Sequence, residues 1–165
     1  MPSSGTNHYT PPMNEPDAAN DYQAAHAQLL ASSFVRLTGQ PLAAIDAGAA
    51  DPARSLFLSP MAVVSHNTDD DPLFNYANRT ALQAFDLPWS EFVGLPSRKS
   101  VDSNDVEQRK ALMTRVTRDG YVSGYSGIRI SASGRRFRIC NATIWNLIDD
   151  QGIYRGQAAV FDIEA

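Results

Sequence analysis

The chain of 165 residues contains one cysteine, three histidines and no hydrophobic run long enough to cross a membrane. A single cysteine, Cys140, excludes an internal disulfide and fits a reducing compartment, so we expect a cytoplasmic protein. A transmembrane helix needs about 20 apolar residues, and the N-terminus lacks the basic and apolar regions of a signal peptide. We therefore expect neither a membrane association nor a secreted domain.

The few histidines leave little basis for metal or acid–base chemistry. His8 falls in the polar N-terminus, and His26 and His66 are too far apart in sequence to form a metal-ligand motif. The acidic run 69–71 follows His66, but it lacks the glycine and glutamate positions of a helix–loop–helix calcium site. We interpret this run as a solvated turn, and we expect it and His66 to lie outside any cavity. No catalytic residue and no metal site is predicted.

Charge of neither sign dominates the sequence, since the formal net charge is −4. Pairs of basic residues occur on several predicted elements, but acids are interleaved with them, which is typical of solvated faces. A chain with this balance has no electrostatic drive toward anionic membranes. Nucleic-acid binding is likewise not expected.

Composition divides the chain into three parts. Residues 1–20 are rich in Pro, Ser, Asn and Asp and lack periodicity, which predicts a disordered tail. Residues 21–54 are predicted to hold an amphipathic helix over 21–38, ended by Gly39, followed by an Ala-rich mobile connector. Residues 55–165 mix helical and strand patterns and form the main predicted domain.

The main predicted domain has the pattern of a five-stranded sheet with helices. Strands are predicted from alternating or continuous apolar patterns over residues 62–66, 73–76, 124–131, 136–148 and 154–163. Asn78 caps a short helix, Ser90 starts a second one, and a long amphipathic helix over 102–119 ends at Gly120. Short turns between the last three strands predict antiparallel neighbours. The predicted fold class is α+β, with an antiparallel five-stranded sheet, helices on one face and the N-terminal amphipathic helix.

Three segments of the sequence carry a resemblance to a known family. The run PLFNYANRTALQAFDLPWSEFVGLPS (72–97) resembles the centre of a PAS sensor domain, where an Asn precedes a short helix and a W-S-E-F-x-G turn enters the next. Together with YSGIRISASGRRFRICNATIWNLID (125–149) and GQAAVFDI (156–163), it makes the chain resemble the MEKHLA domain. This PAS-like family occurs alone in bacteria and at the C-terminus of plant homeodomain–leucine zipper proteins. The resemblance implies a PAS-like fold over most of the chain.

The resemblance also allows two cofactors of PAS relatives to be tested. Flavin photosensors of this fold carry a reactive cysteine in a short helix before the long one, and the comparable residues 94–98 contain none. Haem-binding relatives usually place a histidine on the long helix, and residues 102–119 contain none. The cofactor therefore stays unknown, with neither flavin nor haem expected.

The long predicted strand over 136–148 sets the position of the predicted ligand pocket. Its face with Asn141 and Trp145 is the more aromatic, so we expect the helices to cover that face. Asn141, Trp145, Tyr76 and Tyr125 are then predicted to bind a small organic ligand, with Asn141 as its polar anchor. The alternative for Asn141 is a hydrogen bond to a neighbouring backbone group.

The N-terminal helix has apolar residues on more than one side. Leu30, Phe34 and Leu37 form one stripe, and we predict that this stripe supports a homodimer.

Two classes of function remain open. The first is a non-catalytic regulatory module of PAS-like type that senses a small ligand or binds a protein and reports through its N-terminal helix. The alternative is a small-molecule enzyme with a cone-shaped cavity in an α+β fold. The sequence favours the first class because it places no acid–base pair near the predicted pocket.

Overall fold

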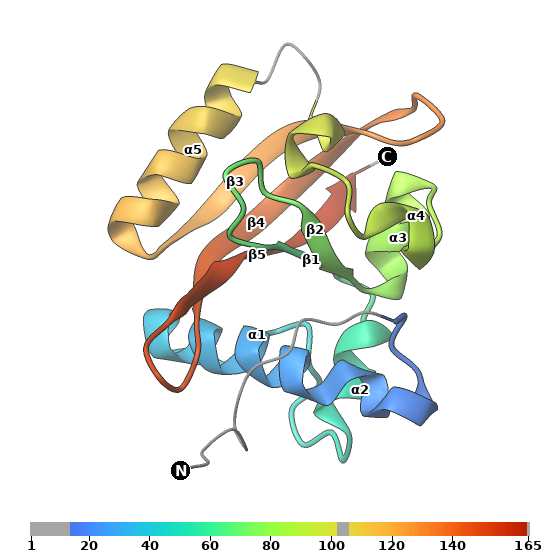
Figure 1. Ribbon diagram of the computed structural model, residues 1–165, viewed down its shortest axis with the longest axis vertical. Coiled ribbons are helices and arrows are strands. Elements are labelled where there is room, and N and C mark those ends of the chain that lie inside the picture. Colours follow the sequence, from blue (N-terminus) through green and yellow to red (C-terminus); the bar gives the residue numbers. More distant parts are fainter. Residues whose placement is uncertain (1–13, 102–105, 165) are drawn as a thin grey trace.

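The structure is a computed structural model that describes residues 14–101 and 106–164 (Figure 1). A five-stranded sheet with strand order β2-β1-β5-β4-β3 lies at its centre, and all neighbouring strands are antiparallel. Its strands are β1 (Ala62–His66), β2 (Phe74–Ala77), β3 (Tyr121–Ile130), β4 (Arg136–Ile148) and β5 (Tyr154–Glu164). The predicted α+β class and five-stranded antiparallel sheet are confirmed.

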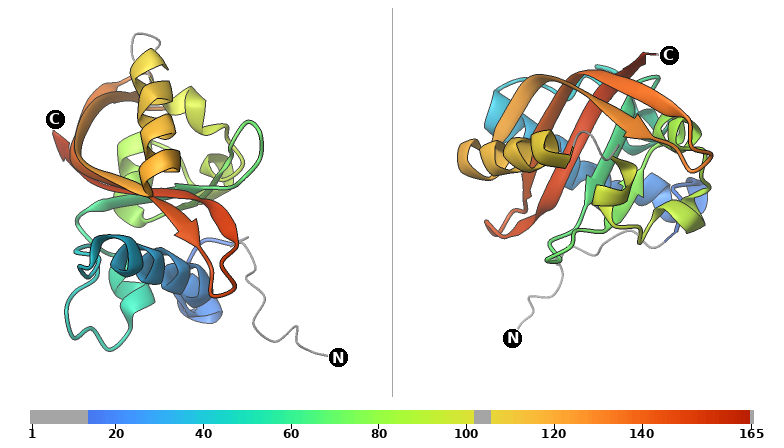
Figure 2. Two further views of the ribbon diagram at one scale, coloured as in Figure 1. Left: turned by 90° about the vertical axis from the view of Figure 1, so that its left-hand side faces the viewer. Right: turned by 90° about the horizontal axis from the view of Figure 1, so that it is seen from above.

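Helices cover the sheet from both sides, as the two views in Figure 2 show. On one side lie α1 (Ala24–Thr38), which follows the short helix η2 (Ala18–Gln23), and α2 (Pro52–Phe57). On the other side lie α3 (Arg79–Phe85), α4 (Trp89–Phe92), η3 (Ser97–Ser100) and α5 (Val106–Asp119). No helix in the described ranges is long and apolar enough to cross a membrane.

The apolar stripe of α1 packs on the chain's own sheet. The Phe34 ring meets the Trp145 indole edge to face with 4.9 Å between centroids, and Trp145 Nε1 donates to the Leu30 carbonyl at 3.2 Å. Leu37 is partly buried against the same core. Leu30, Phe34 and Leu37 therefore do not form a free dimer surface. The predicted dimer role of these three residues is therefore wrong, because the face of α1 that a second copy would contact is already buried against β4.

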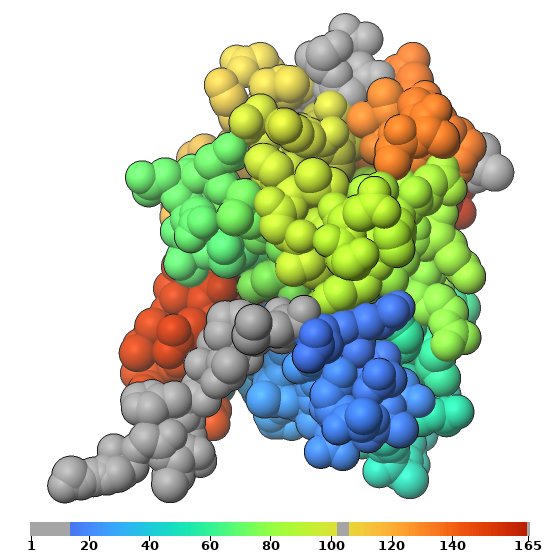
Figure 3. Space-filling view, turned by 45° about the vertical axis from the view of Figure 1, so that its right-hand side comes forward, coloured from blue at the N-terminus to red at the C-terminus, as the bar shows by residue number. Residues whose placement is uncertain are grey.

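The ordered N-terminal region begins before the predicted helix. Residues 1–13 of the predicted tail lie outside the described residues, whereas residues 14–20 take part in the fold (Figure 3). Asp17 and Asn20 form a capping box at the start of η2, and Asn20 Nδ2 donates to the Glu15 carbonyl at 2.9 Å. The α-helix then ends at Gly39, whose φ of 73° is the left-handed conformation expected from the sequence.

The predicted mobile connector also packs on the domain. Leu42 and Ala44 are buried, and α2 begins at Pro52, inside the predicted connector. Residues 21–54 therefore share one core with the domain predicted over 55–165.

Asn78 joins three elements with one side chain. Its Oδ1 accepts from the backbone N–H of Ala81 at 3.1 Å, which confirms the predicted helix cap, and from that of Val63 at 3.0 Å. Its Nδ2 donates to the carbonyls of Leu56 at 3.0 Å and Met61 at 2.8 Å. A single buried amide thus connects α3 to β1 and α2.

A bulge at Asn141 divides β4 into two halves. Asn141 has a φ of 53°, and the pairing of β4 with β5 shifts register at this point. Ile139 before the bulge and Ile144 after it both face α5, whereas Trp145 faces α1. The predicted continuous alternation over 136–148 is therefore wrong, because one extra residue in a strand reverses the face of every residue after it.

Candidate functional site

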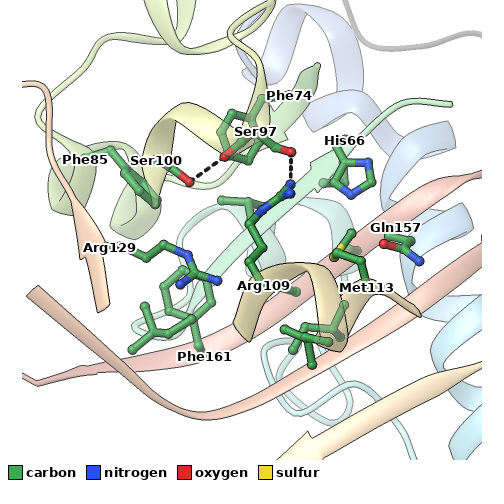
Figure 4. Close-up of a pocket in the computed structure, with 17 residues that line it drawn as sticks. His66, Phe74, Phe85, Ser97, Ser100, Arg109, Met113, Arg129, Gln157 and Phe161 are labelled. Atoms are coloured by element: carbon green, nitrogen blue, oxygen red, sulfur yellow. Dashed lines mark hydrogen bonds between the residues drawn. The ribbon is translucent and has the colours of Figure 1, made fainter. Parts of the chain in front are cut away.

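A cavity lies between the sheet and the helices η3 and α5 (Figure 4). Its volume is about 70 Å³, which is room for roughly five water molecules or a small organic molecule of similar size. Most of its wall is apolar and comes from Phe74, Phe85, Leu112, Ile139, Ile144 and Phe161. A mostly apolar pocket with a few convergent polar groups is the usual form of a small-molecule site.

His66 at the end of β1 lines this cavity, contrary to the sequence-based expectation. Its Nδ1 lies 3.0 Å from the Asn67 carbonyl. Since a carbonyl only accepts, Nδ1 carries the proton, and Nε2 of the neutral ring is an acceptor. Burial lowers the pKa of His66, and the positive charge of Arg109 lowers it further. Hydrogen bonds to the Asn67 backbone and the Gln157 side chain act in the opposite direction and raise this pKa. The ring is therefore neutral near pH 7.

Gln157 on β5 presents a second buried acceptor to the same cavity. Its Nε2 donates to Asn146 Oδ1 at 2.9 Å, which leaves Oε1 on the other side of the amide. Gln157 Oε1 lies within reach of a hydrogen bond from a protonated His66 ring. In the neutral ring Nε2 is itself an acceptor, so the two atoms cannot pair, and neither has another hydrogen-bond partner among the described residues. Their exposed fractions are only 2 % for Gln157 and 8 % for His66. Unpaired acceptors this deeply buried are uncommon in folded proteins.

Two arginines supply the charge of the site. Arg109 extends from α5 across the cavity and donates to Ser97 Oγ, and Ser100 Oγ donates to the Ser97 carbonyl at 2.8 Å (Figure 4). Arg129 on β3 donates to the Ile128 carbonyl at 3.0 Å. None of the 17 residues drawn at the cavity is an aspartate or a glutamate. Within the described ranges, no group of three or more His, Cys, Asp or Glu is arranged to hold a metal ion.

The four predicted ligand residues do not line the cavity. Asn141 is exposed on the bulge, with its Nδ2 3.5 Å from Asp162 Oδ2. Trp145 lies on the opposite face of the sheet, against α1. Tyr76 is fully buried elsewhere in the core, whereas Tyr125 stands beside the site, with the Arg129 guanidinium 5.7 Å from its ring centre. The bulge explains the correction for the two residues of β4, because it turns Asn141 outward and Trp145 away from α5.

The sequence did contain a signal for one residue of the observed site. Arg109 precedes the apolar residues Leu112, Met113 and Val116 by three, four and seven positions, so it falls on the buried stripe of α5. A charged residue on such a stripe is a candidate for a buried polar contact. The contributions of Ser97 and Gln157 have no comparable local signal, because they depend on how distant elements meet.

A buried hydrogen-bond chain links the cavity wall to α1. Ser65, which precedes His66 on β1, donates through Oγ to Asn75 Oδ1 at 2.6 Å. That leaves Ser65 Oγ to accept from Nε2 of His26 on α1, at 2.9 Å. The His26 ring also stacks on Tyr76 with 5.1 Å between centroids. The network thus connects β1 and β2 on one side to the N-terminal helix on the other.

The buried His26 makes folding stability depend on pH. Burial lowers its pKa from 6.5 to about 3. A group whose pKa is lower in the folded than in the unfolded chain stabilises the fold above its unfolded pKa, and this stabilisation is lost as pH falls toward the folded pKa. We expect His26 alone to reduce the free energy of unfolding by about 2 kcal/mol between pH 7 and pH 5.

Urea unfolding of the intact chain and of His26→Gln at both pH values measures this contribution. Between pH 7 and pH 5, the free energy of unfolding of the variant is expected to fall by about 2 kcal/mol less than that of the intact chain. This difference does not depend on the absolute stability of the variant. The buried His66 acts in the same direction and is present in both proteins. Equal losses in the two proteins would contradict a neutral His26 in the fold.

Solved structures of sensor domains share this architecture. The PAS domain of a protein from Colwellia psychrerythraea matches with a TM-score of 0.57 and 13% identity, over 66% of this chain and 90% of that one. A structure of the photo-excited blue-light photoreceptor Vivid matches with a TM-score of 0.54 and 18% identity, over 82% and 94%. The structure of the light-state dimer of this fungal photoreceptor matches with a TM-score of 0.55 and 17% identity, over 79% of this chain and 90% of that one. These similarities show a fold of the PAS type.

Sequence comparison gives the family more narrowly. No curated protein resembles the chain significantly in sequence. Residues 24–163, which include α1, the sheet and every element that lines the cavity, match the MEKHLA domain. The chain therefore belongs to the MEKHLA domain family, whose sensor-like fold it shares.

Proposed function

We propose that the protein is a non-catalytic sensor module that binds a small organic ligand in the cavity under α5. The observation that carries this proposal is the pair of unpaired buried acceptors, His66 Nε2 and Gln157 Oε1, in a mostly apolar pocket. Each unpaired buried polar atom destabilises a fold by about 1–3 kcal/mol. A ligand with a hydrogen-bond donor removes the penalty of the acceptor that it reaches, so the site favours occupancy.

The proposed signal passes through β1 to α1. Neighbouring residues of a strand point to opposite faces, so His66 meets the ligand while the Ser65 hydroxyl contacts His26. A ligand that moves His66 therefore also changes the hydrogen bond that ties α1 to the sheet. This route gives the N-terminal helix a direct mechanical connection to the cavity.

The enzyme alternative is favoured by one observation, which is His66 in the cavity. A neutral imidazole can act as a general base, but here a backbone carbonyl orients its Nδ1, and no carboxylate is found among the lining residues. We therefore keep binding as the proposed function. Mass spectrometry of the ligand after prolonged incubation tests this choice, since turnover would change the ligand's mass.

The proposal includes neither flavin photochemistry nor haem. A cavity of about 70 Å³ is small for the three fused rings of a flavin. The only cysteine, Cys140, lies on β4 with its Sγ 3.8 Å from the Asp162 carbonyl and does not line the cavity. The described length of α5 contains no histidine to ligate haem. A free cysteine also agrees with the proposed cytoplasmic location.

The binding proposal is tested by native mass spectrometry of the purified full chain. We expect a bound small molecule in the intact protein and at least a tenfold lower occupancy in His66→Leu, which lacks the acceptor. Asn141→Gly is the matched control, because it removes the polar group predicted from the sequence while its positive φ suits glycine. Unchanged occupancy in His66→Leu, or loss in Asn141→Gly alone, would contradict the assigned site.

A homodimer remains part of the proposal. One Vivid structure similar in fold is described as a light-state dimer. On α1, Val35 is an exposed large apolar residue at 46 % exposure, and the outer face of a helix is available to a second copy. Sedimentation at tens of micromolar is expected to show a dimer for the intact chain and a monomer for Val35→Glu. Gln83→Glu, at an exposed position of α3 on the other side of the sheet, should leave the dimer unchanged, and a monomeric intact chain would contradict the proposal.

A further inference from the structure

Two guanidinium groups line the cavity without a carboxylate partner among the described residues. Arg109 donates to Ser97 Oγ and Arg129 donates to the Ile128 carbonyl. An arginine has five N–H donors in a planar fork. No salt bridge within the described ranges includes either residue. Both forks therefore have donors left for a ligand.

The positive charge of this pair is held at an electrostatic cost. Burial lowers the pKa of Arg109, and the like charge of Arg129 lowers it further. Asp71 opposes this effect from a distance, but its carboxylate is bound to Arg98 Nε at 3.0 and 3.1 Å. An anion placed between the two arginines relieves their repulsion and receives charge-assisted hydrogen bonds, which are about twice as strong as neutral ones.

The remaining walls limit what this anion is attached to. Aromatic and aliphatic side chains form most of the cavity, so the ligand has an apolar body. The acceptors His66 Nε2 and Gln157 Oε1 need a donor from the ligand. An ammonium group would be repelled by Arg109 and Arg129, whereas a hydroxyl supplies a neutral donor.

We propose that the cavity binds a short-chain hydroxycarboxylic acid, with its carboxylate on Arg109 and Arg129 and its hydroxyl donating its one proton to either His66 Nε2 or Gln157 Oε1. This assignment rests on the proposed sensor function and specifies the chemistry of its ligand. The cavity volume of about 70 Å³ limits the acid to a few carbon atoms.

Four probes of nearly equal size separate the features of the ligand: 2-hydroxybutanoate, butanoate, butanamide and inorganic phosphate. Titration of the full chain, followed by calorimetry and by NMR shifts, gives their affinities. We expect 2-hydroxybutanoate to bind at least threefold more tightly than butanoate. Butanamide, which keeps the shape and loses the charge, is expected to bind at least tenfold more weakly than butanoate, and phosphate more weakly than either acid.

Charge-removing variants identify the residues that hold the carboxylate. Arg109→Met and Arg129→Met are each expected to weaken 2-hydroxybutanoate at least tenfold while leaving butanamide unchanged. Arg109→Lys keeps the charge but loses the planar fork, so an intermediate affinity is expected. Arg115→Met, at an exposed position of α5, is the matched control and should change nothing. Circular dichroism and thermal unfolding confirm that each variant is folded.

The outcomes separate the ligand class from the sensor function itself. If butanamide binds as tightly as the acids, if phosphate binds best, or if both arginine variants keep full affinity, the carboxylate assignment is overturned and the cavity remains a binding site. If no probe binds, native mass spectrometry decides. A co-purified carboxylic acid supports the assignment, a co-purified uncharged molecule overturns it, and an empty protein overturns both proposals.

Discussion

Replacing Gly156 with alanine is expected to lower the free energy of unfolding by at least about 3 kcal/mol. Gly156 lies in β5 with a φ of 123°, a conformation that residues with a side chain rarely adopt. A Cβ built at this position would lie 1.9 Å from the His66 carbonyl oxygen and 3.0 Å from its carbonyl carbon. Both are backbone atoms of β1, so the clash is relieved only if the two strands move apart.

Gly152→Ala is the matched control for this substitution. Gly152 also has a positive φ, 78°, but a Cβ there would have no atom within 4 Å. Its expected loss is the backbone strain alone, about 1–2 kcal/mol. Urea unfolding of both variants measures the difference, and equal losses would show that β1 and β5 do not approach as closely as described. Because the clash is at His66, Gly156→Ala should also abolish binding at the proposed ligand site.

Removing the Asn78 side chain is the second substitution that is expected to lower the free energy of unfolding strongly. Asn78→Ala leaves two backbone N–H groups, of Val63 and Ala81, and two carbonyls, of Leu56 and Met61, without the partner described above. Each unsatisfied buried group costs about 1–3 kcal/mol, although the four contributions are not additive. We expect a loss of at least about 3 kcal/mol in the free energy of unfolding.

Asn67→Ala provides the comparison for Asn78. The Asn67 Oδ1 also accepts two backbone N–H bonds, from Asp69 at 3.1 Å and Leu73 at 2.9 Å, but at a turn near the surface. Water can replace those bonds, so the expected loss is about 1 kcal/mol. Thermal and urea unfolding should show that Asn78→Ala is much less stable than Asn67→Ala. A similar stability of the two variants would contradict the central role of Asn78.

Several elements could be predicted because their signals are local. The apolar run of β1 gave its bounds, 62–66, and the aromatic pattern of β4 gave 136–148, as observed. The side chain of Asn78 identified the start of α3, and Gly39 the end of α1. In each case the residue that sets the boundary is adjacent to it in sequence.

The cavity could not be predicted in the same way. A bulge depends on pairing between strands, so the alternating pattern of β4 gave no warning that Asn141 would reverse the faces. The cavity combines His66, Ser97, Arg109 and Gln157 from four separate elements. The sequence excluded His66 because it is at a strand end, yet that end is where the sheet, η3 and α5 meet (Figure 4).

In the proposed sensor, the adjacency of Ser65 and His66 restricts how ligand preference can change during evolution. A substitution on this part of β1 alters the cavity and the attachment of α1 together, so specificity and output change in one step. Ser97, Arg109 and Met113 line the same cavity from helices on the opposite side of the sheet from α1. Homologues that recognise different ligands while keeping one output are therefore expected to differ mainly in η3 and α5.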